Sequence, residues 1–344
     1  MRVLTVVGAR PQFIKAAPVS RVLRQHHDEF LLHTGQHYDD AMSELFFREL
    51  DIPEPNKNLG VGSGPHGAQT GAMLAGIESV ALDYRPDWIL VYGDTNSTLA
   101  GALAGAKQHI PVAHVEAGLR SFDRRMPEEI NRVLADHVST LLLCPTDTAV
   151  GNLKAEGITH GVRMCGDVMY DAFLENLEVA RRTPPAVDGE FDLLTLHRAE
   201  NVDDAGRLKK ILDGIGASGR RVVFPAHPRT RDALERDAVS TPGNVTVIDP
   251  VGYLEMLVLE ERASVIVTDS GGVQKEAYFA GRPCVTLRET TEWPETVRAG
   301  WNVLVGADPD RIASAMRDFR PAGDRPQVFG DGHAAQRVVE SLNP

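Results

Sequence analysis

Residues 265–287 read VIVTDSGGVQKEAYFAGRPCVTL, and this stretch decides the predicted fold. Val265–Val267 is a short β-branched run that favours a strand, and Thr268–Gly272 has the composition of a turn that leads into a helix. Ser270 can cap that helix. The two glycines after it carry no Cβ, so an anion can approach the backbone N–H groups at the positive end of the helix dipole. The stretch predicts a phosphate seat; an ordinary glycine-shaped turn is the alternative.

The composition limits the classes of protein to consider. The chain has 344 residues, more than one core usually supports, so we expect two domains. Its 36 basic and 48 acidic residues give a formal charge of −12, which argues against sequence-independent binding to nucleic acid or to an anionic membrane. The three cysteines show no C-x-x-C spacing, so they indicate neither a disulfide framework nor a zinc site. No apolar run approaches the ~20 residues of a membrane-spanning helix, and we expect a soluble, cytoplasmic protein.

Two basic residues follow the first predicted strand. Arg10 lies on the turn after this strand, and Lys15 lies within the first two turns of a helix that Pro11 opens at its first position. Cations near a helix N-terminus oppose the helix dipole, so the pattern makes sense if an anion lies between them. Two solvated charges are the alternative.

Two acids follow later strands of the first half. Asp94 comes after the buried strand 86–92, and Glu116 comes after the strand 111–115. Open α/β sheets place their ligands at the carboxyl ends of such strands, so we expect both carboxylates at one sheet edge. A helix N-cap is the alternative, and it suits Asp94 better than Glu116.

Residues 127–139 predict a helix that starts with proline and two acids. Glu128 and Arg132 lie one turn apart, either as an i,i+4 ion pair or facing a cleft. We expect four apolar residues to form the buried stripe on the opposite side: Ile130, Val133, Leu134 and Val138.

The pattern of strand, polar turn and helix restarts after Pro184-Pro185, which reads as a linker. His197 ends the strand 191–196, and a short helix is expected over 330–342. The glycine-rich segment 60–67 follows coil instead of a strand, so it predicts a mobile loop and not a dinucleotide site. The whole chain predicts an α/β protein of two doubly wound, Rossmann-like domains that face each other across a cleft.

Seven segments resemble, in order, the motifs of the non-hydrolysing UDP-N-acetylglucosamine 2-epimerase family. They are GARPQFIKAAPV, VYGDTNSTLAG, HVEAGLRS, MPEEINR, LHRAEN, TDSGGVQKEA and RETTEWPETV. The resemblance implies the GT-B architecture, with domains at 1–168 and 169–330 and a C-terminal helix, 331–344, that packs back on the first domain. It also implies a homodimer and a reaction without NAD or metal. In that reaction UDP-N-acetylglucosamine and UDP-N-acetylmannosamine interconvert by elimination of UDP and its re-addition to a 2-acetamidoglycal.

The resemblance also assigns roles to single residues. The catalytic residues it implies are Asp94, Glu116, Glu128, Arg132 and His197. The residues it implies for binding the substrate or its UDP part are Arg10, Lys15, Met256, Ser270, Gly271, Gly272 and Glu276. Which carboxylate is the base and which the acid stays open.

Two departures from the family pattern bear on function. Trp293 replaces an arginine that many members carry, and it either stacks on the nucleotide or packs. Thr34–Asp39 replaces a stretch that binds an activating second substrate molecule in many members, so we do not expect that site here. The first and sixth motifs look closer to 2-epimerases of UDP-2,3-diacetamido-2,3-dideoxyglucuronate, the alternative substrate. A GT-B glycosyltransferase and a non-catalytic nucleotide-sugar sensor are the alternatives of other classes, and neither explains three carboxylates.

Overall fold

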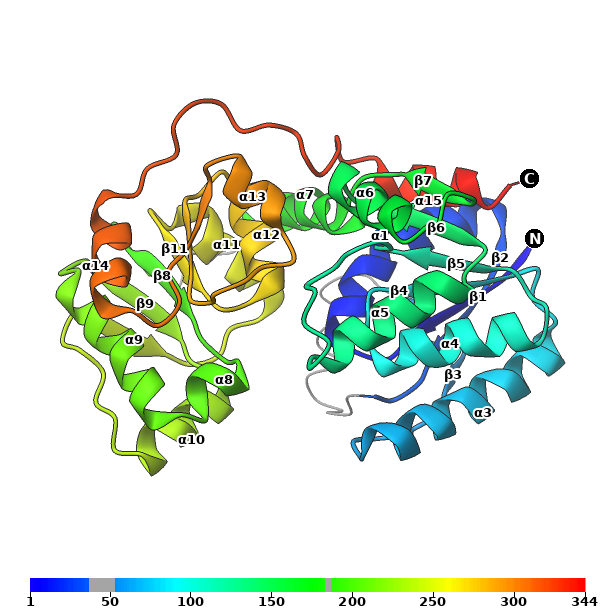
Figure 1. Ribbon diagram of the computed structural model, residues 1–344, viewed down its shortest axis with the longest axis horizontal. Helices are drawn as coiled ribbons and strands as arrows, with labels where there is room; N and C mark the ends of the chain where they lie inside the picture. The colour runs from blue at the N-terminus through cyan, green and yellow to red at the C-terminus, as the bar shows by residue number, and fades with distance from the viewer. Residues whose placement is uncertain (37–52, 183–186, 344) are drawn as a thin grey trace. The chain divides into compact units, whose positions relative to one another are not determined.

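The computed structural model describes residues 1–36, 53–182 and 187–343. They form two compact units: unit 1 is Met1–Leu174 with Gln327–Pro344, and unit 2 is Glu175–Pro326 (Figure 1). The expected domain limits after residues 168 and 330 lie near these bounds and stay predictions. Pro184-Pro185 and the second half of Thr34–Asp39, residues 37–39, lie outside the described residues.

Unit 1 is built on a parallel sheet with helices on its faces. Among its described residues the strand order is β3-β2-β1-β4-β5-β6-β7. The strands are β1 (Arg2–Val7), β2 (Asp28–His33), β3 (Lys57–Asn58), β4 (Trp88–Tyr92), β5 (Val112–Val115), β6 (Leu141–Cys144) and β7 (Val162–Met164). The helices are α1 (Arg10–His26), α3 (His66–Tyr84), α4 (Asn96–Lys107), α5 (Pro127–Val138), α6 (Asp147–Ala155) and α15 (Ala334–Ser341), while α7 (Val168–Ala180) continues into unit 2.

Unit 2 repeats this plan. In the part of it that is described, the sheet is parallel and has the order β10-β9-β8-β11-β12-β13. The strands are β8 (Asp192–Thr195), β9 (Val222–Pro225), β10 (Val245–Ile248), β11 (Ile266–Thr268), β12 (Cys284–Thr286) and β13 (Asn302–Leu304). The helices are α8 (Ala199–Val202), α9 (Ala205–Ala217), α10 (Pro228–Arg236), α11 (Tyr253–Arg262), α12 (Gly271–Phe279), α13 (Pro294–Arg298) and α14 (Pro309–Asp318).

The strand order reverses once in each sheet. In unit 1 the reversal lies between β1 and β4, and in unit 2 it lies between β8 and β11. Chain connections diverge at such a point and leave room beyond the carboxyl ends of the strands, where open α/β sheets bind ligands. The segments after β1, β4, β8 and β11 are therefore where a site is expected in each unit.

Small residues bring α4 close to the sheet of unit 1. A Cβ placed on Gly101 would lie 2.7 Å from Val91 Cγ1, and one on Gly105 would lie 2.4 Å from Val112 Cγ2. Both distances are too short for a larger residue, so the helix approaches β4 and β5 because glycine occupies these positions. The helix begins at Asn96, earlier than the sequence suggests, and Thr95 is its N-cap. Asp94 is therefore not the cap, and this alternative for it is excluded.

The predicted buried stripe of α5 is wrong for two of its four residues, while Val133 and Val138 are half-buried. Ile130 and Leu134 are 46% and 44% exposed, whereas Asn131, Arg132 and Asp136 are buried. The physical reason is that these three polar side chains find hydrogen-bond partners at the sheet edge. A buried polar group with partners costs little, so the helix docks through its polar face.

Other local expectations also differ from the structure. The 60–67 segment is not wholly a loop, because His66 and Gly67 form the first turn of α3. Residues 168–180 form the helix α7, for which the sequence analysis predicted no helix. In the described residues no helix has both the length and the apolar character to cross a bilayer.

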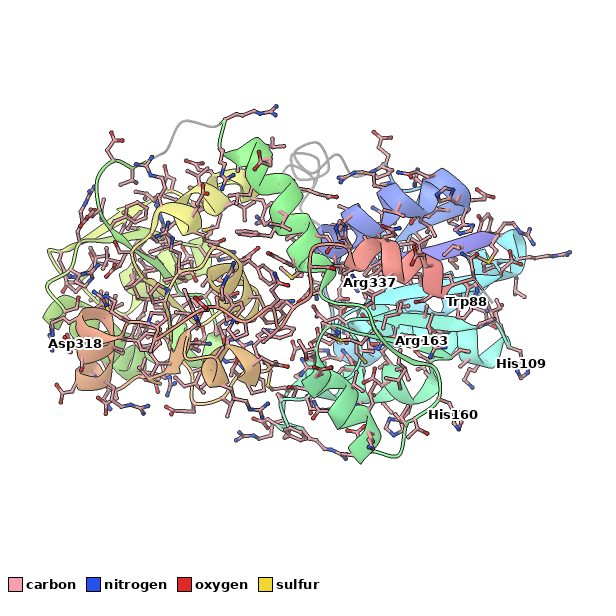
Figure 2. All side chains as sticks on the ribbon, turned by 90° about the horizontal axis from the view of Figure 1, so that it is seen from above. Trp88, His109, His160, Arg163, Asp318 and Arg337 are labelled. Carbon is pink, nitrogen blue, oxygen red and sulfur yellow. The ribbon has the colours of Figure 1, made fainter. Side chains whose placement is uncertain are left out.

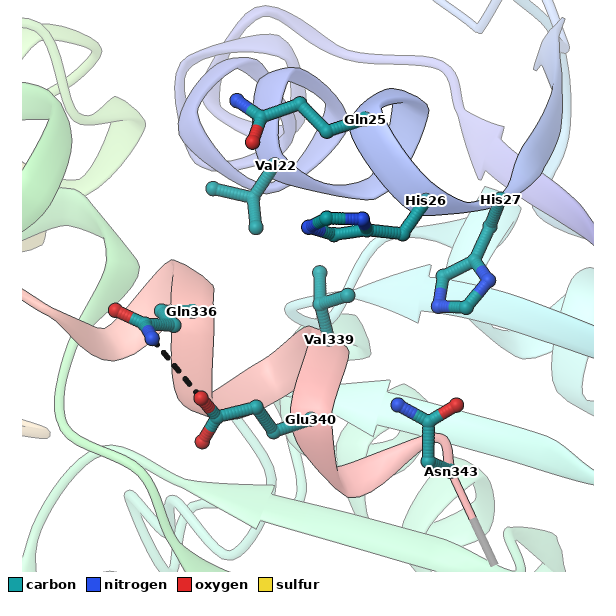
Figure 3. Close-up of a pocket in the computed structure, with 8 residues that line it drawn as sticks. All are labelled: Val22, Gln25, His26, His27, Gln336, Val339, Glu340 and Asn343. Atoms are coloured by element: carbon teal, nitrogen blue, oxygen red, sulfur yellow. Dashed lines mark hydrogen bonds between the residues drawn. The ribbon is translucent and has the colours of Figure 1, made fainter.

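The C-terminal helix α15 packs on α1, at the opposite end of the sequence. Figure 2 shows Arg337 on this helix, where its guanidinium contacts Asp331 and the Cys165 carbonyl. Figure 3 shows the groove between the two helices, into which Val22 and Val339 point from opposite sides. Both ends of the chain thus build unit 1.

Candidate active site

A buried ion pair lies at the carboxyl edge of the unit 1 sheet. Lys15 Nζ on α1 is 2.5 Å from Glu116 Oε1, at the end of β5, and both residues are less than a tenth exposed. Both atoms border Gly93, because a Cβ there would lie 3.1 Å from the ammonium and 3.7 Å from Glu116 Oε1. Lys15 is therefore not a solvated charge, because a buried carboxylate of the protein itself is its partner.

Glu116 has a backbone conformation that is rare for its residue type. Its φ is +69°, and its N–H and that of Ala117 both approach the Leu143 carbonyl, at 3.1 and 3.2 Å. A non-glycine residue in the left-handed region costs of order 1–3 kcal/mol, and such residues cluster at functional sites. The bend turns Glu116 away from the line of β5 and toward Lys15.

Asp94 is held by α5. Arg132 donates to Asp94 Oδ2 and, at 2.8 Å, to Glu129 Oε2. Asn131 donates to the Asp94 carbonyl at 3.0 Å. The helix thus fixes both the backbone and the carboxylate of Asp94, next to β5 and its Glu116.

A second carboxylate of α5, Asp136, is fully enclosed. It accepts hydrogen bonds from the Gly118 N–H and from Arg120, at 3.1 and 2.7 Å, and its other oxygen lies 2.7 Å from His114 Nδ1. Burial alone would raise the pKa of Asp136, but His114 and Arg120 outweigh burial and lower it. The carboxylate is therefore ionised inside the unit.

In unit 2 the opening stretch of the sequence folds as predicted. β11 ends at Thr268, and Ser270 caps α12 by accepting from the Val273 N–H at 3.4 Å. Among the described residues, the Gly271 and Gly272 N–H groups have no acceptor. Unpaired amides at a helix N-terminus are donors for an anion, so this end of α12 has the geometry of the predicted phosphate seat.

Trp293 borders that seat and is itself packed. The Lys275 ammonium lies over its ring, 4.1 Å from the centroid, and both side chains are buried. Trp293 Nε1 lies 3.7 Å from where a Gly271 Cβ would be, and Glu292 Oε2 lies 3.6 Å from the same point. The ring therefore packs against Lys275 and presents its nitrogen edge beside the start of α12.

His197 is oriented by a buried acid. Its Nδ1 lies 3.2 Å from Asp269 Oδ1, and its own N–H and that of Arg198 also donate to this carboxylate. Burial raises the pKa of Asp269, but these hydrogen bonds and that of Asn201 outweigh burial and lower it. With Nδ1 directed at the carboxylate, the half-exposed ring has Nε2 for a ligand.

Glu276 of α12 has a buried acid for a neighbour. Glu260 on α11 is fully enclosed, and neither of its carboxyl oxygens has a hydrogen-bond partner among the described residues. Burial, and then the charge of Glu276, raise the pKa of Glu260 well above its ordinary value. The surroundings of Glu260 therefore favour its neutral form, next to Glu276, a residue expected to bind the UDP part of the substrate.

The structure groups the predicted residues by unit. In unit 1 Lys15, Glu116, Asp94 and Arg132 gather at one edge, while Arg10 and Glu128 are exposed at the first turns of their helices. In unit 2 the glycines, Ser270 and Glu276 share α12, and Met256 is half-buried against the adjoining core. The individual roles of these residues, and their convergence across a cleft, stay predictions.

Several residues that hold the site together could not be identified from the sequence. Arg132 donates to Glu129, whereas the sequence suggested a pair with Glu128, and Asp269 orients His197. Gln12 accepts from Gly8 N–H and donates to the Tyr92 carbonyl, so it joins the turns after β1 and β4. Gln12 lies inside GARPQFIKA and Asp269 precedes Ser270, so their motifs marked them, but their partners are distant in sequence.

We expect Glu260→Gln to change the pH dependence of stability. The native pKa of Glu260 lies above the unfolded value. The contribution of Glu260 to the stability of the folded state is therefore fully present below about pH 4.5 and is lost as the pH rises through the native pKa. In thermal melts from pH 4 to 9, the Tm of the variant should fall less than that of the parent at high pH, because glutamine cannot ionise. The difference should be about 2–4 °C for each kcal/mol that ionisation of Glu260 costs the folded parent. Glu255→Gln, a half-exposed position of α11, should melt like the parent. An equal dependence of Tm on pH in the parent and in Glu260→Gln would contradict the raised pKa of Glu260.

Comparison with known proteins gives the family. The model of the UDP-N-acetylglucosamine 2-epimerase family matches residues 21–343. A UDP-2,3-diacetamido-2,3-dideoxy-D-glucuronate 2-epimerase of Pseudomonas aeruginosa is 51% identical, and a UDP-N-acetylglucosamine 2-epimerase homolog of Methanococcus maripaludis is 52% identical, each over 99% of both chains.

A solved structure agrees with the match. The crystal structure of a Methanocaldococcus jannaschii UDP-GlcNAc 2-epimerase, in complex with UDP-GlcNAc and UDP, has a TM-score of 0.92 with this chain, at 45% identity and 99% coverage of each. The two parallel α/β sheets and this neighbour give the GT-B architecture. The chain is therefore an isomerase that belongs to the UDP-N-acetylglucosamine 2-epimerase family.

Proposed function

We propose that this chain is a non-hydrolysing 2-epimerase that interconverts UDP-N-acetylglucosamine and UDP-N-acetylmannosamine. The observation that carries the proposal is the pair of carboxylates at one sheet edge, Glu116 with Lys15 and Asp94 with Arg132. A sensor or a glycosyltransferase that shares the nucleotide seat has no need for paired acids there. In the described residues no three His, Cys, Asp or Glu side chains gather to hold a metal ion.

The chemistry needs a base and an acid because the hydrogen at C2 of the sugar is not acidic. Departure of UDP from C1 with the electrons of the C–O bond builds positive charge on the ring, and a base then takes the C2 proton. The product is UDP and a 2-acetamidoglycal. A proton returned to the opposite face of C2, with attack of the UDP oxygen on C1, completes the inversion. We propose Asp94, Glu116 and Glu128 as the groups that share these two proton transfers.

The diphosphate gains negative charge as it leaves C1, so it needs hydrogen-bond donors that are already in place before the bond breaks. We propose that the Gly271 and Gly272 amides and the helix dipole of α12 bind it, and that Arg10, Lys15 and His197 supply further charge and hydrogen bonds. Asp269 supports this role for His197, since it fixes the ring so that Nε2 is the nitrogen offered to the ligand. Met256 and Glu276 are proposed contacts of the uridine part.

The sugar has one specific alternative. The relative from P. aeruginosa, at 51% identity, is named as an epimerase of the diacetamido-glucuronate nucleotide, and the M. jannaschii enzyme, at 45%, as one of UDP-N-acetylglucosamine. Elimination and re-addition would be the same for both, because both sugars carry an acetamido group at C2. A cytoplasmic location stays a prediction.

The proposed reaction exchanges the proton at C2. With UDP-N-acetylglucosamine in D₂O and no NAD, metal or acceptor, we expect the epimer to carry deuterium at C2, since the group that takes the old proton is not the one that delivers the new one. Proton NMR follows the epimer and the loss of the C2 signal. A parallel tube holds UDP-2,3-diacetamido-2,3-dideoxyglucuronate, and the faster of the two reactions identifies the substrate. Epimer without label would contradict the exchange of the C2 proton and point to internal return or to oxidation at a neighbouring carbon, and no epimer in either tube would contradict the proposed function.

Single carboxylate changes test the proton-transfer roles. Asp94→Asn and Glu116→Gln should each lower kcat by about two to four orders of magnitude, the usual range for general acid–base catalysis, while UDP affinity changes within a few fold. Steady-state kinetics and calorimetric titration with UDP measure the two effects. Glu78→Gln, an exposed carboxylate of α3, is the matched control and should keep parental kcat. Near-parental turnover in both site variants would leave Asp94 and Glu116 with a structural role only.

We also propose a homodimer. The support in unit 1 is that four of its large apolar side chains are exposed. Phe122 is 78% and Leu82 is 61% exposed, and Ile130 and Leu134 of α5 are also exposed. Burial of such side chains is a common basis for subunit contact. Light scattering of the purified chain should give twice the monomer mass, and Ile130→Lys with Leu134→Lys should lower it if α5 is in the interface. A monomer mass for the parent at micromolar concentration would contradict the dimer.

A further inference from the structure

His114 is a fully buried histidine whose two ring nitrogens both face oxygen atoms. It lies on β5, two residues before Glu116, and has no exposed surface. Nδ1 is 2.7 Å from Asp136 Oδ1, and Nε2 is 2.7 Å from the Gly93 carbonyl oxygen. The ring therefore bridges α5 and the turn that follows β4.

The partners determine how many protons the ring holds. A backbone carbonyl only accepts hydrogen bonds, so Nε2 must carry a proton to bond with Gly93. Asp136 already accepts from the Gly118 N–H and from Arg120, and these contacts keep it ionised, so Nδ1 must also carry a proton. A ring with both protons is an imidazolium. A neutral ring would set a nitrogen lone pair against an oxygen at 2.7 Å.

The surrounding charges balance a cation at this place. Asp136 faces the ring from α5, and Arg120 contacts Asp136 and, at 2.6 Å, Glu156. With a protonated His114 these four groups carry two positive and two negative charges, whereas a neutral ring would leave one negative charge in excess. Of the neighbouring strands, β6 contributes the Cys144 thiol, whose pKa is raised by burial and by Asp136, so it stays uncharged. Two further ion pairs lie near Gly93 in the described part of the chain: Lys15 with Glu116, and Arg132 with Asp94.

The His114 ring fixes the peptide of Gly93, the residue that lies between β4 and Asp94. Gly93 has φ +63°, its N–H donates to the Val115 carbonyl at 3.0 Å, and its carbonyl accepts from His114. Asp94 follows it directly, and the Lys15–Glu116 pair lies against its Cα. Without the proton on Nε2, the hydrogen bond to the Gly93 carbonyl would be lost. The Gly93 peptide would then be free to move, and the carboxylates of Asp94 and Glu116 would no longer be held in place.

We propose that His114 is a positioning residue that acts as a buried imidazolium, so that epimerase turnover requires its second proton. The proposal rests on the proposed function for the reaction, and on the two ring contacts for the mechanism. His114 touches no substrate in this account; it acts through Gly93. A misplacement of about 1 Å can cost on the order of 100-fold in rate, which is the size of effect expected here.

Two neutral variants separate the two contacts. In His114→Gln the side-chain amide nitrogen lies near the position of Nε2 and can still donate to Gly93, whereas in His114→Asn it lies near Nδ1 and can donate only to Asp136. We expect His114→Asn to lower kcat by about 10- to 100-fold relative to His114→Gln, with similar UDP affinity and with a Tm no lower than that of His114→Gln, because His114→Asn keeps the contact with Asp136. Equal kcat in both variants would overturn the proposal.

The ring itself can be observed without turnover. In the parent chain labelled with ¹⁵N-histidine, we expect one ring with both N–H protons protected from exchange at pH 7–8, and its absence from both variants. A His114 ring with a single N–H would overturn the proposal even if the variants failed to fold. Absence of turnover with either nucleotide sugar would instead contradict the proposed function, while turnover without a protected imidazolium would contradict only this inference.

Discussion

The buried carboxylate of Asp136 is the contact on which the sheet edge of unit 1 depends. It binds the segment after β5 through the Gly118 N–H and Arg120, and it binds β5 itself through the His114 ring. It lies one turn from Arg132, which holds Asp94 from the same helix. Removal of one partner from such a network leaves a buried charge without compensation, which typically costs about 3–5 kcal/mol. The position of the candidate acids is therefore tied to the folding of the whole edge.

Much of the fold could be predicted from the sequence because its signals are local. Pro11 at the start of α1 and Ser270 before two glycines identify their helix starts from a few neighbouring residues. The polar face of α5 could not be predicted in this way, since Ile130 and Leu134 have the spacing of a core stripe. The polar face of α5 is buried because Asn131 and Arg132 bind the backbone and the carboxylate of Asp94, which lies far away in sequence.

The candidate site follows the same division. The motif residues Lys15, Glu116 and Asp94 could be identified singly, but the pairing of Lys15 with Glu116 joins positions 101 residues apart. The buried acid Glu260 belongs to no motif, and only its enclosure distinguishes it from any other glutamate on a helix. Sequence patterns thus locate the ends of strands, whereas the protonation states depend on long-range packing that a single sequence does not display.

The return of α15 to α1 has a consequence for how the chain is made. Val338 and Leu342 are fully buried in unit 1, and the Ala335 N–H donates to Asp171 at 2.7 Å, so the last helix is part of that unit's packing. A ribosome releases this helix only after all of unit 2 has been synthesised. Domains generally fold in the order in which they emerge, but here the unit that emerges first is completed last. Until then the surface of α1 that receives the helix is uncovered, and a nascent chain stalled near its end would expose it to chaperones and proteases.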